Sequence, residues 1–130
     1  SISQSTDYFI ARLQDFPQVA PFNVKLDEIT PHGLTVSPAT AADAAIIADF
    51  RDTLADRFGY RHPDHESYVM HITVAYIVRW LSRASHETYL PALQALAQAF
   101  RAEVPIIELG PADFCTFDDM NHFRPLFRFS

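Results

Sequence analysis

The stretch Tyr68-Val69-Met70-His71-Ile72-Thr73-Val74-Ala75-Tyr76 is rich in β-branched and aromatic residues, a composition that favours a β-strand. Because successive strand side chains point to opposite faces, we expect His71 and Thr73 on one face, about 7 Å apart. The apolar side chains would share the other face and pack in the core: Met70, Ile72, Val74 and Tyr76. An imidazole beside a hydroxyl on a rigid element can transfer a proton and hold a phosphate oxygen.

Further strands are predicted on both sides of this stretch. Residues 22–29 and 34–37 flank Thr30-Pro31-His32-Gly33, whose proline and glycine occupy positions typical of a type I turn, so we expect a hairpin. Short strands are also predicted at residues 105–109, 113–117 and 125–129.

Helices are predicted from capping residues and from apolar periodicity. Ser5 or Thr6 can cap a short helix that stops before residue 17, where a proline stands. Thr40-Ala41-Ala42-Asp43 resembles a capping box and would begin a helix that Gly59 ends. A further helix, with Pro91 in its first turn, is indicated by apolar residues at helical spacing: Tyr89, Leu93, Leu96, Ala97 and Phe100.

Together these elements predict a single α+β domain over residues 1–130. Strands joined by hairpins and mixed with helices indicate an antiparallel or mixed sheet with helices packed on one face. At 130 residues the chain is long enough to bury roughly two thirds of its unfolded surface.

Composition excludes several functional classes. A net charge of -6 disfavours a broad grip on the backbone of extended nucleic acid. No stretch approaches the ~20 apolar residues that a membrane span needs, and no signal segment is evident. The lone Cys115 cannot form an internal disulfide, so a reducing, cytoplasmic location is expected.

Other candidate sites are weaker. The spacing in His62-Pro63-Asp64-His65 fits neither a zinc pair on one helix face nor a finger, so we predict no metal and no cofactor. Cys115 is expected to be a small core residue and not a nucleophile paired with His122. Arg79 would lie about 26 Å along the strand from His71, so Arg61 and Tyr68 are the preferred substrate-binding candidates.

The segments around these residues resemble a known superfamily. Residues 58–68, leading into His71-Ile72-Thr73, are similar to the two-histidine phosphoesterases, the LigT-like and cyclic-phosphodiesterase-like proteins. Residues 106–111, 114–115 and 119–123 resemble the same bacterial and fungal branch, whose function is unassigned. The resemblance extends from about Tyr8 onward. It implies one lobe of a two-lobed fold, in which each lobe gives one His-x-Thr/Ser motif to a shared groove.

The resemblance also implies an activity, metal-free cleavage of a phosphoester such as the 2',3'-cyclic phosphate of a small nucleotide or an RNA end. One histidine would act as base and the other as acid, since imidazole titrates near neutral pH. His71 maps onto one of these and Thr73 onto a phosphate-binding hydroxyl. This chain departs from the pattern because it has one such motif in an apolar strand; His65-Glu66-Ser67 and His86-Glu87-Thr88 fall in a loop and at a helix start.

Three hypotheses follow. In the first, the chain is the C-terminal lobe of a phosphoesterase, completed by a missing N-terminal lobe or, as a homodimer, by a second copy. In the second, it is a non-catalytic lobe that binds phosphate, nucleotide or a partner. In the third, it is an α+β domain whose His71 is structural. The sequence leaves all three open.

Overall fold

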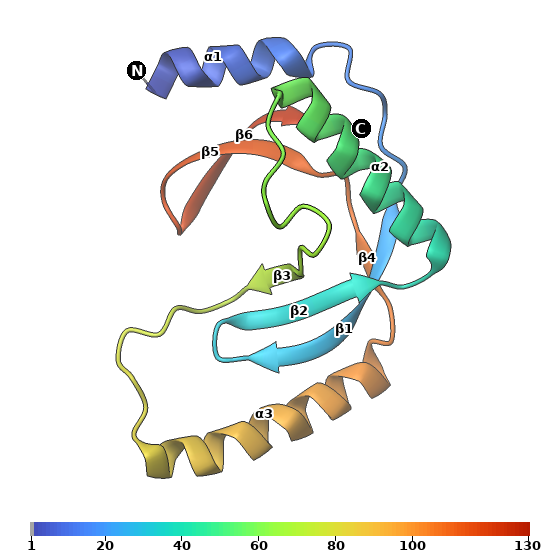
Figure 1. Cartoon of the computed structure of the whole chain (residues 1–130). Helices are drawn as coiled ribbons and strands as arrows, with labels where there is room; N and C mark the ends of the chain where they lie inside the picture. Colours follow the sequence, from blue (N-terminus) through green and yellow to red (C-terminus); the bar gives the residue numbers. More distant parts are fainter. Residues whose placement is uncertain (1) are drawn as a thin grey trace.

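The computed structural model describes residues 2–130, with side chains from residue 5 onward (Figure 1). The described part begins with helix α1 (Ile2–Leu13), hairpin strands β1 (Phe22–Thr30) and β2 (Gly33–Pro38), and helix α2 (Ala41–Phe58). It continues with β3 (Met70–Thr73), α3 (Arg83–Glu103), β4 (Ile107–Leu109), β5 (Asp113–Asp119) and β6 (His122–Arg128). This is the α+β fold that the sequence predicts.

Four of the strands form one antiparallel sheet in the order β3-β2-β1-β4. Its apolar face packs on α2 around a cluster made by Val24 of β1, Val36 of β2 and Ile47 of α2. Met70 and Ile72 of β3 pack against the same cluster. Burying this cluster removes branched aliphatic side chains from water, which is the main favourable term in holding α2 on the sheet.

The helix α2 begins and ends where the sequence predicts. The Thr40 hydroxyl accepts a hydrogen bond from the backbone N–H of Asp43, and the Asp43 carboxylate accepts one from the backbone N–H of Thr40, which completes the capping box. At the other end Gly59 adopts the left-handed conformation, with φ 64°. The Asp43 carboxylate also accepts from the backbone N–H of Asn23 at 2.8 Å, so the cap ties α2 to β1.

The strand β3 is shorter than the predicted residues 68–76. It ends at Thr73 because its partner β2 begins at Gly33, and the next two backbone N–H groups, of Val74 and Ala75, both donate to the carbonyl oxygen of His32. The expected apolar stripe is therefore confirmed for Met70 and Ile72 but wrong for Val74 and Tyr76, whose exposed fractions are 71% and 51%.

Two helices start earlier than predicted. Helix α1 already runs from residue 2, so the expected caps Ser5 and Thr6 lie inside it. Helix α3 begins after Ser82, whose hydroxyl accepts from the backbone N–H of Ser85, and this places Pro91 in the helix interior instead of the first turn. The α3 helix lies along β1 (Figure 1), held there by Arg101, whose guanidinium donates to the carbonyl oxygens of Leu26 and Asp27.

The last two strands form a separate two-stranded sheet, the β5–β6 hairpin. It packs against α1 and α2 through aromatic rings: Phe9 contacts Phe58 of α2 and Phe114 of β5, and Phe50 of α2 contacts Phe129. None of the helices in the described part of the chain combines the length and apolar character that a bilayer span requires.

Candidate functional site

His71 and Thr73 project from the same, exposed side of β3, as the sequence predicts. Their intervening neighbour Ile72 packs in the core, which fixes the orientation of both polar side chains. Thr35 of β2 lies directly opposite His71 in the strand register. Since directly paired residues of an antiparallel sheet share a face, Thr35 places a second hydroxyl beside the imidazole.

His71 and Thr73 line a cavity of about 590 Å³. One wall is β3 and the chain that follows it, with His71, Thr73 and Tyr76. The other wall is the end of the β5–β6 hairpin, where the turn contributes Met120 and Asn121 and the start of β6 contributes Phe123. The cavity thus joins segments about fifty residues apart in the sequence, and His71 faces an open hollow and not packed hydrocarbon.

Gly33 lets β3 lie against β2 at the position where Thr73 pairs. A Cβ atom on residue 33 would lie 2.0 Å from the carbonyl oxygen of Ile72, far inside any normal contact. The glycine is therefore required by the close approach of the β3 backbone, and it sets the place of His71 and Thr73.

Tyr68 comes closer to His71 than its place in the sequence suggests. It precedes β3, and its ring centroid lies 6.3 Å from that of His71. The guanidinium of Arg51 on α2 lies over the Tyr68 ring at 4.4 Å and donates to the carbonyl oxygen of His65 at 2.9 Å. Tyr68 is about half exposed, and it lines two hollows shared with Arg51 and His65 and not the cavity of His71.

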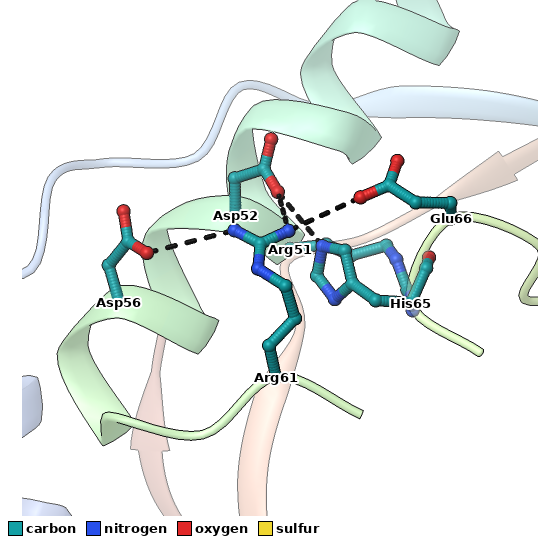
Figure 2. Close-up of polar contacts among 6 residues, drawn as sticks. All are labelled: Arg51, Asp52, Asp56, Arg61, His65 and Glu66. Carbon is teal, nitrogen blue, oxygen red and sulfur yellow. Dashed lines mark hydrogen bonds and ion pairs between the residues drawn. The ribbon is translucent and has the colours of Figure 1, made fainter. Parts of the chain in front are cut away.

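The structure places Arg61 in a network of carboxylates (Figure 2) and not in the lining of the His71 cavity. Its guanidinium contacts Asp52 at 2.7 Å, Glu66 at 3.4 Å and Asp56 at 3.7 Å. The His65 imidazole donates from Nε2 to the same Asp52 oxygen at 2.9 Å. Hydrogen bonds from Arg61, and to a lesser extent from His65, hold the pKa of the Asp52 carboxyl below its ordinary value. With three carboxylates around it, Arg61 has little charge left to offer a phosphate.

The same network contains the one group of potential metal ligands found among the described residues. Donor atoms of Asp52, His65 and Glu66 lie within 4.8 Å of one another. However, Arg61 bonds two of these three groups, the carboxylates of Asp52 and Glu66, and a guanidinium in that position repels a metal cation. The arrangement fastens the loop that precedes β3 to helix α2, and we assign it that structural role.

Comparison with known proteins gives one similar structure. The whole chain superposes, with a TM-score of 0.93 and 42% sequence identity, on a conserved protein of unknown function from Agrobacterium tumefaciens strain C58. The match covers 100% of this chain and 56% of that one, so the chain spans little more than half the length of this relative. No protein-family model and no curated protein matches the sequence.

The structure therefore brings His71 and Thr73 together in the cavity, places the Tyr68 ring near His71 but not in the cavity lining, and leaves Arg61 outside. Sequence reasoning missed Thr35, although the alternation of Leu34 and Val36 as core residues would have placed Thr35 on the His71 face. It also missed Asn121 and Phe123, because only the tertiary structure brings the β5–β6 turn to the cavity.

Proposed function

We propose that His71 and Thr73 form one half of a phosphoester-processing site that uses no metal. The supporting observation is that both side chains project from one exposed strand face into a single cavity, with the Thr35 hydroxyl on the same face. The substrate would be a small phosphoester, for example the 2',3'-cyclic phosphate of a nucleotide or of an RNA end.

The chemistry assigns each group a task. Attack at phosphorus needs a base for the proton of the incoming water or hydroxyl, and an acid for the departing oxygen. The His71 imidazole would perform one of these transfers, while the Thr73 hydroxyl would donate to a non-bridging phosphate oxygen, where negative charge accumulates in the transition state. The Thr35 hydroxyl, which lies opposite His71 in the strand register, would donate a second such bond.

One imidazole can perform only one of these two proton transfers, as base or as acid. Among the described residues that line the cavity, His71 is the one that carries an imidazole. We therefore propose that a second lobe or a second subunit supplies the other histidine, and that the complete enzyme is a cytoplasmic hydrolase of the two-histidine type.

Exposed apolar surface next to the cavity supports this completion. The chain leaving β3 carries Val74, Val78 and Trp80, whose exposed fractions are 71%, 98% and 83%. Apolar surface of this extent is typical of a covered interface. The greater length of the Agrobacterium relative is consistent with a second lobe in one polypeptide.

A second candidate function is a non-catalytic lobe that binds phosphate or nucleotide. It is favoured by the presence of only one imidazole among the described cavity-lining residues. In this case the hydroxyls and His71 would hold a phosphate without turnover.

Hydrolysis of a 2',3'-cyclic nucleotide by the native gene product, with its intact mass measured, tests the proposal. His71→Ala should lower the rate by about 10²–10⁴-fold, the contribution typical of one proton-transfer group. His86→Ala is the matched control, because His86 shares the letters of the motif but lies exposed near the start of α3. Equal rates for His71→Ala and the control would refute the enzymatic role of His71. Binding without turnover, lost in His71→Ala, would support the non-catalytic lobe.

A further inference from the structure

The half of the cavity opposite His71 is built from residues that phosphate chemistry does not use. It consists of aliphatic, amide and aromatic side chains from the β5–β6 hairpin: Met120, Asn121 and Phe123. No lysine or arginine is among the described residues that line it, so this half is not suited to a second phosphate. It is suited to the uncharged, organic part of a ligand.

Phe123 offers a supported aromatic surface. Its ring packs against that of Phe117, its partner across the hairpin, with centroids 5.2 Å apart and planes inclined at 47°. About half of the Phe123 side chain is nevertheless exposed, at 48%. A ring held by one neighbour and open on its cavity side loses little conformational freedom when a flat ligand stacks on it. Tyr76, 51% exposed, adds a second aromatic side chain to the cavity from the wall that carries His71.

Asn121 offers a hydrogen-bonding edge beside these rings. Its backbone N–H donates to the Asp119 carboxylate at 2.7 Å, which fixes the conformation of the turn. Its side-chain amide, in contrast, is hydrogen-bonded by no group in the described part of the chain. An amide carries donors and an acceptor close together and can match the paired donor and acceptor edge of a heterocycle.

We propose that the β5–β6 turn recognises the organic part of the phosphoester, and that this part carries a flat heterocyclic ring such as a nucleobase. The ring would stack on Phe123 and Tyr76, Asn121 would bond its polar edge, and the phosphate would lie at His71 and Thr73. A cavity of about 590 Å³ falls within the range of ~300–1,000 Å³ usual for small-molecule sites, so a mononucleotide fits. This inference rests on the proposed function for the phosphate half.

Calorimetric titration of the chain with three probes tests the inference: inorganic phosphate, a nucleoside, and the corresponding nucleoside 2'-monophosphate. Phe123→Ala should weaken nucleotide and nucleoside binding about 5- to 100-fold, the loss typical of one base–aromatic stack, and leave phosphate binding unchanged. Asn121→Ala should alter the preference among the four bases. Leu126→Ala is the matched control, because Leu126 is an exposed β6 residue that does not line the cavity. If Phe123→Ala does not fold, Phe123→Leu replaces it as the variant that removes the aromatic stack.

The two proposals fail in different ways. His71→Ala should weaken the binding of phosphate and of the nucleotide and leave the binding of the nucleoside unchanged. If phosphate binding is unchanged in this variant, the proposed function is refuted but the role of the hairpin is not. Nucleotide binding that is no tighter than phosphate binding, and is unchanged in Phe123→Ala and Asn121→Ala, overturns the role of the hairpin turn. Failure of all three probes to bind the chain overturns both.

Discussion

Replacing Gly33 with alanine is expected to displace β3 and, with it, the candidate site. The added Cβ would lie 2.0 Å from the carbonyl oxygen of Ile72 and 3.0 Å from the Cα of Thr73. All of these atoms are backbone, so no side chain can rotate away to relieve the contact. Restoring an ordinary separation requires β3 to move by more than an ångström, a large shift for a strand of four residues.

The cost can be estimated from comparable changes. Forcing extra atoms into a close-packed site typically destabilises a protein by about 1–3 kcal/mol, and a rigid backbone contact belongs at the upper end. We therefore expect Gly33→Ala to lower the free energy of unfolding by about 2–3 kcal/mol, measured by urea denaturation. The same variant should weaken phosphate binding at His71, because Thr73 pairs directly with residue 33.

The other two glycines provide graded controls. At Gly110 an added Cβ meets nothing within 4 Å, so Gly110→Ala should change stability by no more than about 1 kcal/mol. At Gly59 the space is also open, but φ is 64°, and Gly59→Ala should cost about 1–2 kcal/mol from backbone strain alone. If Gly33→Ala and Gly110→Ala unfold at the same urea concentration, then β3 does not lie as close to Gly33 of β2 as the structure shows.

Further predictions concern the helix cap, pH and Arg61. Thr40→Ala should destabilise the fold by about 1 kcal/mol in urea denaturation, because it removes the N-cap of α2. Ser67→Ala, at an exposed serine outside the cap, is the comparison, and equal midpoints would contradict the capping assignment. The folded-state pKa of Asp43 is lowered from 3.8, chiefly by the hydrogen bond from Thr40, and that of Asp113 is lowered by Arg128. The stability that these carboxylates contribute is therefore complete above pH 3.8 and is lost as pH falls through the lowered values; a pH-independent free energy of unfolding between pH 5 and about 2 would refute this. Arg61→Met should leave the affinity for phosphate at His71 within about twofold of wild type, because the charge of Arg61 is neutralised by Asp52 and the neighbouring carboxylates. A loss of affinity of about tenfold or more in a phosphate titration would show that Arg61 takes part in phosphate binding.

Local features of the chain were determined by the sequence alone. The capping box at Thr40 and the left-handed Gly59 bound α2 in both the prediction and the structure, since both signals act within a few residues. The period-two alternation of Met70, His71 and Ile72 likewise fixed which side chains of β3 are exposed. Such patterns are decided by backbone geometry and by the separation of apolar from polar side chains, and both can be read along the chain.

Tertiary structure decided how far each element extends and what the site contains. The strand β3 stops at Thr73 because β2 offers no partner beyond Gly33, a limit set by a segment forty residues earlier in the chain. Arg61 is adjacent to the candidate site in sequence but bonds to Asp52 on α2, and Phe123 is distant in sequence but lines the cavity of His71. Pairing register and the packing of distant segments depend on the whole fold, and no local pattern encodes them.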